Sequence, residues 1–446
     1  MQTTIDYKPT SMTIGPDGRL YVLDAIGPVH AYTVNANGAL GNHVVYNVLP
    51  APPSGIWTAL GLAFDPSSTA QNMTVWISHS ITGGENFSEG AANSSRITRV
   101  TNLTGASPQT TEMISGLPRA VANHAINSIH FDPTDPTWLY FTIAGETGAG
   151  GPNNTPTEFG TRPEQPLSSA MLKAQVRSGS WSPANNGNCA SAVNDGNGTA
   201  SKTIPATCSV QFVATGLRNT YDFVFATDGM IYGNDNALGV AGTVPSQPSP
   251  DCQGIVDYGS GTFDPGEQPD KLQRIDPNPA VTYYGHPNPA RDQCVFYNGS
   301  FQSALFGTTV TPPANYQPAL RNMNTPGTQQ ARSLNGIIQY KAGTFGGTLQ
   351  GQLVLTAFSG AQSNQGLHRI ATDAASGPVR IPVTVGGNAY TFNQPLPLVE
   401  LSDGRIVVGE FRGRTTADGR ILVLSPVATG GGGSWASRTA MPQATL

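Results

Sequence analysis

The stretch YDFVFATDGMIYGNDN, residues 221–236, decides the fold class of this chain. Its two halves are apolar runs rich in aromatic residues, which favour β-strands, and they flank the pair Asp228-Gly229. Asp-Gly tolerates the positive φ angles that a tight hairpin turn demands. The stretch therefore predicts two antiparallel strands joined by a tight turn.

The same pattern recurs along the chain, with Asp-Gly or Asp-Pro at the turn. Repeated hairpins with flanking strands are typical of a propeller, in which each sheet buries its faces against its neighbours around a central channel. Six copies predict an all-β fold, a six-bladed β-propeller. The other copies are MTIGPDGRLYVLDA (12–25), a copy at 60–80, INSIHFDPTDPTWLYFTIAG (126–145), a looser copy at 335–360, and LPLVELSDGRIVVGEF (396–411).

The copies are unevenly spaced, which indicates long loops inserted into a regular frame. The insertions 148–207 and 237–282 are rich in Gly, Pro and polar residues, and we expect them to shape the mouth of the channel, with plain spacers as the alternative. We expect the propeller to span 1–428. Residues 429–446 contain a Gly run and resemble a linker followed by the start of a further, kelch-like domain; an expression linker or a disordered tail is the alternative.

The composition agrees with short strands and many turns. The 446 residues include 52 Gly and 36 Pro, and only 11% are charged. The formal net charge of −5 comes with no stripe of Lys and Arg, which argues against nucleic acid and anionic membrane surfaces as partners. No apolar stretch approaches the ~20 residues that a membrane span requires.

Four cysteines lie in the middle of the chain, and their spacing contains no zinc-binding pattern. An even number in a chain rich in Gly, Ser, Thr and Asn favours two disulfides. We predict Cys189–Cys208 and Cys252–Cys294, although the sequence leaves three pairings open and four buried free thiols are the alternative.

The sequence also contains Asn-x-Ser/Thr sequons, several of them in polar, turn-rich stretches, which predicts glycosylation. The N-terminus has no basic segment followed by an apolar core and does not resemble a signal peptide. We therefore expect a secreted, extracellular or periplasmic protein that is processed or is a piece of a longer chain. The sequon asparagines are Asn72, Asn86, Asn93, Asn102, Asn153, Asn197 and Asn298.

Three segments carry a family resemblance. They are NHAINSIHFDPTDPTWLYFTIAGETG (123–148), GLRNTYDFVFATDGMIYGNDN (216–236) and PDKLQRIDPNPAVTYYGHPN (269–288). They resemble segments of the glucose/sorbosone dehydrogenase family, soluble quinoprotein sugar dehydrogenases built on a β-propeller. The resemblance extends over most of residues 11–426 and is most specific in the middle of the chain.

The resemblance implies a catalytic site. His124 falls at the position of the family's catalytic base, and Arg218 and Asn219 fall at its active-site arginine and asparagine, which contact the cofactor. The cofactors implied are pyrroloquinoline quinone and Ca²⁺, with a small sugar or polyol as substrate. The calcium ligands would come from carbonyls near Asp235, Asn236 and Leu238 and from the carboxylate of Asp270.

These residue types suit the reaction. Oxidation of an alcohol removes the hydroxyl proton while hydride moves to the quinone, and a neutral imidazole is a natural base near pH 7. An arginine beside the quinone oxygen stabilises the developing charge, and calcium polarises the same carbonyl. The alternatives are a turn or core histidine for His124 and a structural arginine for Arg218. His130 is expected to be structural, and His286 to line a pocket or a surface turn.

The sequence departs from the family in several places. Asn123 replaces the acid before the histidine, and Glu146 replaces an aspartate. The family's cationic residues in the last two blades are absent, and arginines on nearby loops are the candidates to replace them. The other substituted positions are Trp57, Lys271, Gln273, His286, Phe358, Ser359 and Gln394–Leu396, and the candidate replacements are Arg369, Arg412 and Arg414.

Two hypotheses of different classes follow. The first is a sugar dehydrogenase with the site above. The second is a propeller that has lost the cofactor and binds another extracellular protein or a glycan as a structural or adhesive module. A hydrolase is disfavoured because no pair of carboxylates has a motif-level arrangement.

Overall fold

The structure is a computed structural model. It describes residues 1–83, 89–151, 162–194, 199–236, 242–243, 262–263, 269–278, 280–293, 314–323, 333–359, 364–373, 377–385, 387–413, 418–426 and 444–445. Strands dominate these residues, as the sequence predicts. None of the described helices is both long enough and apolar enough to cross a membrane.

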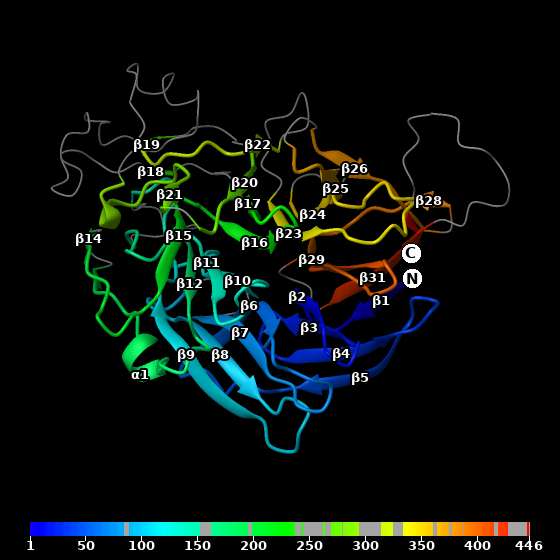
Figure 1. The fold of residues 1–446 in the computed structure, drawn as a ribbon, viewed down its shortest axis with the longest axis horizontal. Coiled ribbons are helices and arrows are strands. Elements are labelled where there is room, and N and C mark those ends of the chain that lie inside the picture. The colour runs from blue at the N-terminus through cyan, green and yellow to red at the C-terminus, as the bar shows by residue number, and fades with distance from the viewer. Residues whose placement is uncertain are drawn as a thin grey trace.

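Six antiparallel sheets surround one axis, which confirms the predicted six-bladed propeller (Figure 1). From the innermost strand outward, blade 1 is β2 (Pro9–Ile14), β3 (Leu20–Asp24), β4 (Val29–Val34) and β5 (Leu40–Tyr46); blade 2 is β6 (Ile56–Phe64), β7 (Val75–Thr82), β8 (Ser95–Thr101) and β9 (Gln109–Leu117); blade 3 is β10 (Ile126–Phe131), β11 (Leu139–Ile143), β12 (Ala170–Ala174) and β15 (Gln211–Thr215). In the same order, blade 4 is β16 (Thr220–Phe225), β17 (Ile231–Asp235), β20 (Lys271–Ile275) and β22 (Arg321–Asn322); blade 5 is β23 (Leu334–Gln339), β24 (Leu353–Ala357), β25 (Gly366–Ile370) and β26 (Val379–Ile381); blade 6 is β29 (Pro395–Glu400), β30 (Ile406–Glu410), β31 (Gly419–Pro426) and β1 (Gln2–Ile5).

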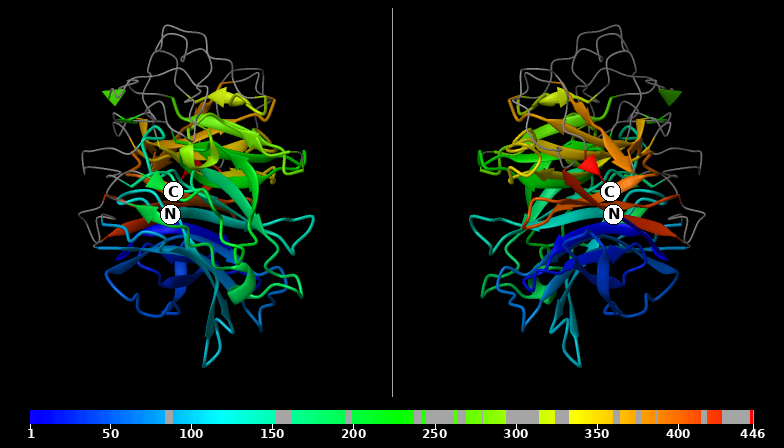
Figure 2. Two further views of the ribbon diagram at one scale, coloured as in Figure 1. Left: turned by 90° about the vertical axis from the view of Figure 1, so that its left-hand side faces the viewer. Right: turned by 90° about the vertical axis from the view of Figure 1, so that its right-hand side faces the viewer.

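Short elements connect or extend the blades. Figure 2 shows the ring from its side, with the β8–β9 hairpin of blade 2 projecting beyond the rim. The short elements are α1 (Pro183–Asn186), β13 (Val193–Asn194), β14 (Thr199–Ala200), β18 (Gly242–Thr243), β19 (Thr262–Phe263), β21 (Thr282–Tyr283), a 3₁₀ turn at Pro289–Arg291, β27 (Val383–Val385), β28 (Asn388–Ala389) and β32 (Ala444–Thr445).

The ring is closed by the two ends of the sequence. β1 pairs antiparallel with β31, with Gln2 opposite Leu422 and Ile5 opposite Gly419. The amino group of Met1 donates a hydrogen bond of 2.9 Å to the Val423 carbonyl. Blade 6 is therefore assembled from both ends of the chain, and Figure 1 shows blue β1 beside red β31.

The turns have the geometry that the Asp-Gly pairs predict. Gly18, Gly229 and Gly404 have φ angles of 76°, 81° and 82°. A residue with a Cβ rarely adopts this left-handed conformation, which explains why glycine follows the aspartate.

Every innermost strand contains a register shift against the second strand of its blade. The shift lies between Pro9 and Ser11 in β2 and between Thr220 and Phe223 in β16. A β-bulge bends a strand and strengthens its twist. Residues before each shift lead to one face of the ring, and residues after it line the axis. The corresponding shifts in the other blades lie at Ala59/Gly61, Ile126/Ile129, Leu334/Ile337 and Pro395/Leu398.

The two predicted insertions are not loops throughout. The first contains β12, the third strand of blade 3, and the second contains β20, the third strand of blade 4. Both strands pair along their whole length with the second strand of their blade. The remainder of the first insertion includes a disulfide between Cys189 and Cys208, in agreement with the predicted pair.

Candidate functional site

One face of the ring carries the residues that the resemblance selects. We call it the site face: innermost strands begin there and second strands end there. His124 precedes β10, Arg218 and Asn219 precede β16, and Asp235 and Asn236 end and follow β17. The main-chain nitrogen of Asn219 donates 2.8 Å to Asp235 Oδ1, and that of Asn236 donates 3.1 Å to the Asn219 carbonyl. Hairpin topology thus places all five on one face.

Gly145 joins the two predicted catalytic residues. Its nitrogen donates 2.7 Å to the carbonyl of Arg218, and its carbonyl accepts 2.7 Å from Nδ1 of His124. A Cβ at this position would lie 2.7 Å from Ser169 Oγ and 2.9 Å from His286 Nε2. Only glycine fits this position without displacing its neighbours. The sequence analysis did not identify Gly145 as a site residue.

His124 has the tautomer of a base. A carbonyl oxygen only accepts, so Nδ1 carries the proton that contacts Gly145, and in the neutral ring Nε2 holds the lone pair. Burial, followed by the positive charge of Arg218, lowers the pKa of His124 well below 6.5. The imidazole is therefore neutral at pH 7 and able to accept a proton.

Arg218 is a buried cation held by main-chain carbonyls. Its Nε donates 3.3 Å to the Gly148 carbonyl, and its Nη1 donates 3.1 Å to the Asn236 carbonyl. Only 9% of the residue is exposed. A positive charge held in a site of low dielectric stabilises negative charge that develops nearby.

The buried carboxylate of Glu164 lies next to Gly145. Glu164 accepts hydrogen bonds from His286 Nε2 at 3.0 Å and from the hydroxyls of Thr147, Ser168 and Ser169. Burial would raise the pKa of Glu164, but the hydrogen bond and charge of His286, with the Ser168 and Thr147 donors, outweigh it and lower the pKa to about 2. His286 is 3% exposed, so it does not lie in a surface turn.

The described carboxylates at the predicted calcium position accept main-chain hydrogen bonds. Asp235 accepts from the Asn219 nitrogen, and Asp270 Oδ2 accepts 3.0 Å from the nitrogen of Leu334. Lys271 lies directly opposite Asp235 in the β17–β20 register. Burial lowers the pKa of Lys271, and the charge of Asp235 counteracts this. Across the described residues no group of three or more His, Cys, Asp or Glu could hold a metal. Leu238 lies outside those residues.

The site face also contains a buried acceptor without a hydrogen-bond partner among the described residues. Asn236 Oδ1 is buried and has no hydrogen-bond partner within the described part of the chain. It lies next to the carbonyl that Arg218 contacts. An orphaned acceptor beside a buried cation suits a planar group that has both a carboxylate and an N–H donor, as pyrroloquinoline quinone has.

The arginines proposed to replace the missing cations differ in position. Arg369 lies on β25, where it donates 2.9 Å to Gln352 Oε1 before the start of β24. That is the end of blade 5 away from the site face, so Arg369 does not replace a site cation. Arg412 follows β30 on the site face and forms an ion pair with Asp418. Arg414 lies outside the described residues.

Lys8 is a further cation on the site face that the sequence did not suggest. It precedes β2, and its Nζ donates 2.8 Å to the carbonyl of Phe411 and 2.9 Å to that of Asp418. These contacts join blade 1 to blade 6. The role of Lys8 could not be predicted from the sequence, because Phe411 and Asp418 lie 403 and 410 residues away along the chain.

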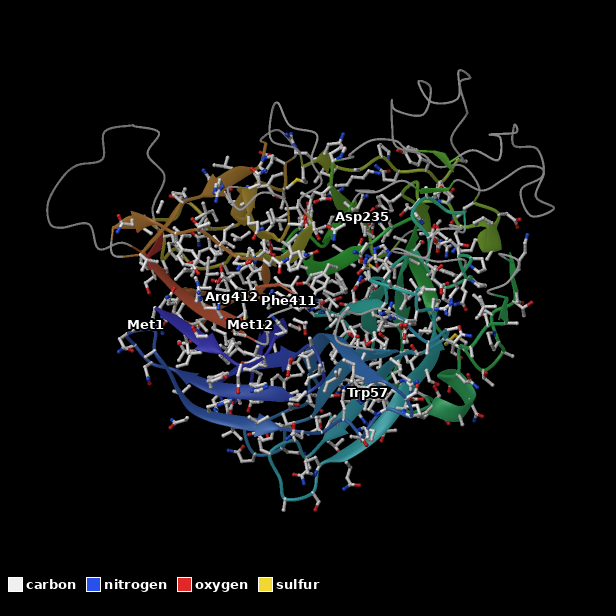
Figure 3. All side chains as sticks on the ribbon, turned by 180° about the vertical axis from the view of Figure 1, so that it is seen from behind. Met1, Met12, Trp57, Asp235, Phe411 and Arg412 are labelled. Atoms are coloured by element: carbon white, nitrogen blue, oxygen red, sulfur yellow. A yellow bond between two sulfur atoms is a disulfide. The ribbon has the colours of Figure 1, made fainter. Side chains whose placement is uncertain are left out.

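Two departures from the family have structural roles. Trp57 is buried, and its indole donates 2.7 Å to the Pro50 carbonyl and packs edge-on against His79. Figure 3 shows Trp57 and Asp235 on different sides of the ring axis. Asn123 has a φ of 60°, the left-handed conformation that asparagine tolerates better than most residues.

The remaining predicted sites are partly described. Asn72 and Asn102 are exposed. Asn93 is half-buried, and its Nδ2 donates 2.8 Å to the Ser191 carbonyl. Outside the described residues lie Cys252, Cys294, Asn86, Asn153, Asn197 and Asn298.

The whole chain resembles solved sugar dehydrogenases in structure. A putative oxidoreductase (glucose dehydrogenase) of Thermus thermophilus is 15% identical, with coverage of 95% of this chain and 100% of that chain and a TM-score of 0.53. The PQQ-bound aldose sugar dehydrogenase of Streptomyces coelicolor is 15% identical, with 95% and 98% coverage and a TM-score of 0.51. The PQQ domain of a pyranose dehydrogenase from Coprinopsis cinerea is 12% identical, with 94% and 96% coverage and a TM-score of 0.51.

These likenesses show the fold. No protein-family model matches the sequence, and no curated protein matches it.

Proposed function

We propose that this chain is a quinone-dependent dehydrogenase that oxidises a hydroxyl group of a small sugar or polyol on the site face. The observation that carries the proposal is the junction at Gly145, which binds His124 through its carbonyl and Arg218 through its nitrogen. His124 and Arg218, distant in sequence, are thereby brought close enough for the charge of Arg218 to lower the pKa of the His124 imidazole. The fold shared with PQQ-bound dehydrogenases supports this assignment.

Different residues of the chain would bind the cofactor and accept the substrate proton. Pyrroloquinoline quinone, when bound, supplies the carbon that accepts hydride. Nε2 of His124 would take the proton of the substrate hydroxyl, while Nδ1 stays bound to Gly145 and fixes the ring. Arg218 would hold an anionic group of the cofactor, and Asn236 Oδ1 would accept a hydrogen bond from its N–H donor. No step of this proposal requires calcium.

The test is reconstitution of the full chain. Protein is mixed with the quinone and assayed with glucose, other aldoses and polyols and an artificial electron acceptor. His124→Ala should lower kcat by about 100-fold or more, the usual contribution of a general base. His43→Ala, on the exposed strand β5, is the matched control and should leave kcat unchanged. Equal turnover by both variants would exclude His124 as the base.

A second function has support of its own. The cofactor has three carboxylates, while Arg412 is paired with Asp418 and Arg369 lies away from the site face. A propeller without cofactor would serve as a structural, adhesive or glycan-binding module of an extracellular protein. Failure to bind quinone at about 50 μM, a concentration at which specific cofactor sites fill, would favour this function.

The location follows from the same features. We propose a secreted or periplasmic protein, because the Cys189–Cys208 disulfide is stable in oxidising compartments. The exposed sequon residues Asn72 and Asn102 suit glycosylation in a eukaryotic secretory pathway. We also propose that residues 429–446 are a Gly-rich linker followed by the start of a further, kelch-like domain.

A further inference from the structure

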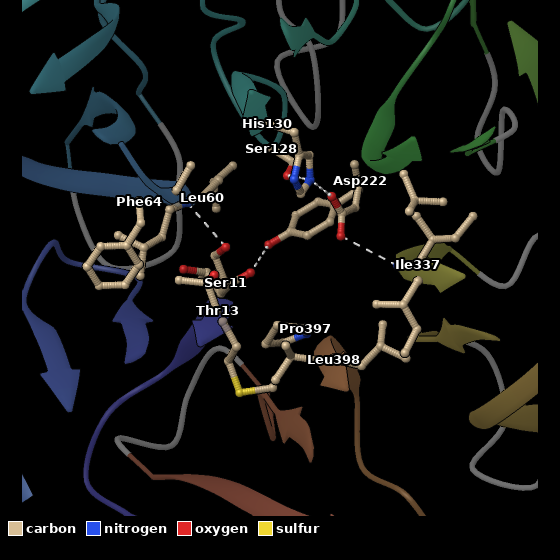
Figure 4. Close-up of a pocket in the computed structure, with 18 of the residues that line it drawn as sticks. Ser11, Thr13, Leu60, Phe64, Ser128, His130, Asp222, Ile337, Pro397 and Leu398 are labelled. Carbon is tan, nitrogen blue, oxygen red and sulfur yellow. Dashed lines mark hydrogen bonds and ion pairs between the residues drawn. The ribbon is translucent and has the colours of Figure 1, made fainter. Parts of the chain in front are cut away.

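A cavity lies on the ring axis. It has a volume of about 400 Å³ and is lined by β2, β6, β10, β16, β23 and β29, the innermost strands of all six blades (Figure 4). This volume falls in the range of small-molecule sites. Its lining residues come from the parts of the strands at or beyond the register shifts, such as Thr13, Phe64 and Val399.

A tyrosine of the cavity wall links blade 4 to blade 1. Tyr221 of blade 4 reaches toward blade 1, where its hydroxyl donates 2.8 Å to the carbonyl of Thr10. Thr10 in turn donates 2.7 Å from Oγ1 to the Ala59 carbonyl in blade 2. The lining of the cavity does not include His124, Arg218, Asn219 or Asn236, so the two sites have no residue in common.

The polar side of the cavity centres on Asp222. Its Oδ1 lies 2.9 Å from both His130 Nε2 and the Phe223 nitrogen, which donate to it. Oδ2 receives a long contact of 3.5 Å from the nitrogen of Ile337. Figure 4 shows the Asp222 carboxylate and the His130 ring at the cavity wall, with Ser128 beside the ring. One carboxylate oxygen thus keeps accepting capacity toward the cavity.

The rest of the lining is apolar or hydroxylic. Leu60, Leu62, Phe64 and Leu398 supply hydrophobic surface, and Ser11 supplies a hydroxyl. Among the described residues that line the cavity there is no Lys or Arg, and Asp222 is the one acidic group. The cavity therefore combines one carboxylate, paired with His130, with an apolar wall.

We propose that this axial cavity binds a small primary amine with an apolar body. The ammonium group would donate to Asp222 Oδ2, and the apolar part would pack against Leu62, Phe64 and Leu398. A charge-assisted hydrogen bond to a half-buried carboxylate gives selectivity for the cation over a neutral molecule of the same shape. His130, which we expected to be structural, becomes the group that orients the carboxylate.

The test uses 2-phenylethylammonium and its neutral counterpart 2-phenylethanol. Isothermal titration calorimetry on the full chain at pH 8 should show saturable binding of the amine, about tenfold tighter than the alcohol. Asp222→Asn should weaken the amine about tenfold and leave the alcohol unchanged. Thr13→Phe, which fills the cavity from β2, should remove binding of both molecules.

The matched control is Glu112→Gln, which neutralises an exposed carboxylate of blade 2 that pairs with Arg96. It should leave both affinities unchanged. Absence of saturable binding in the parent chain, or equal affinity for amine and alcohol, would overturn the proposal. So would an Asp222→Asn chain, folded by circular dichroism, that binds the amine like the parent. None of these results depends on turnover at the site face.

Discussion

At the scale of single residues, the site face depends on groups buried against other blades. Gly145 contacts His124, Arg218 and the Glu164–His286 pair at once. The close approach of Ser169, His286 and Glu164 requires the absence of a side chain on Gly145. The geometry of the candidate base is therefore set by a residue that takes no part in the chemistry.

Gly145→Ala should destabilise the protein by about 1–3 kcal/mol, the usual cost of forcing a methyl group into packed surroundings. It should also lower turnover of the reconstituted protein by moving His124. Urea unfolding measures the first effect. The control is Gly179→Ala, because a Cβ at Gly179 meets no atom within 4 Å. Equal stability of the two variants would contradict the close packing at Gly145.

The buried carboxyl group of Asp24 makes the free energy of unfolding depend on pH. Burial raises its pKa to about 6, although the main-chain nitrogens of Lys8 and Ile26 donate to it and oppose this. The folded state then holds the proton more tightly than the unfolded state. The resulting stability is complete below about pH 4 and is lost as the pH rises through about 6.

Asp24→Asn should therefore raise stability relative to the parent more at pH 7 than at pH 4, by about 3 kcal/mol at most. Urea unfolding at pH 4, 5, 6 and 7 measures the difference. Asp276→Asn, at an exposed position, is the control. A gain that does not change with pH would show that Asp24 ionises as freely when folded as when unfolded.

At the scale of elements, one hairpin with a shifted register is repeated six times. The turn fixes the second strand opposite the first, and the register shift redirects the first strand from the site face to the axis. This repeat explains why residues just before an innermost strand meet on one face. It also explains why Asp222 and His130, after the shift, meet in the axial cavity.

The turn geometry can be tested at Gly229. A Cβ there meets no atom within 4 Å, so the cost of Gly229→Ala comes only from its φ of 81°. We expect a loss of about 1–2 kcal/mol in unfolding free energy. Gly343→Ala, where the nearest atom lies at 3.9 Å and φ is not left-handed, is the control and should change little. Similar losses in both variants would rule out the backbone strain.

At the scale of the whole molecule, stability depends on closing the ring. The innermost strands contact one another in sequence order, from β2 through β6, β10, β16 and β23 to β29, and β29 contacts β2. The first and last blades are joined by β1–β31 pairing and by the Lys8 contacts to Phe411 and Asp418. A ring of six such sheets leaves only short, protected strand edges.

Removal of residues 1–5 deletes β1 and should lower the unfolding temperature by about 10 °C or more, since several main-chain hydrogen bonds and a blade edge are lost. Differential scanning calorimetry measures this. A chain that ends after Pro426 keeps β1 and β31 and is the control. An unchanged transition without residues 1–5 would show that β1 does not close the ring.

Local sequence patterns predicted the six hairpins because strand periodicity and Asp-Gly turns act over about ten residues. The same patterns placed His124 and Arg218 before innermost strands, and hairpin repetition then put both on one face. The third strands β12 and β20 escaped prediction, because each lies within a long insertion rich in Gly, Pro and polar residues.

Contacts between blades could not be read from the chain. Lys8 meets the carbonyl of Phe411 only after the ring has closed, and Glu164 meets His286 across a separation of 122 residues. Such pairs depend on which strand faces which, and many residue pairs would satisfy the local rules equally well. The hairpins therefore come from short-range backbone preferences, whereas the composition of the site face and of the axial cavity comes from the closure that brings six distant segments to one axis.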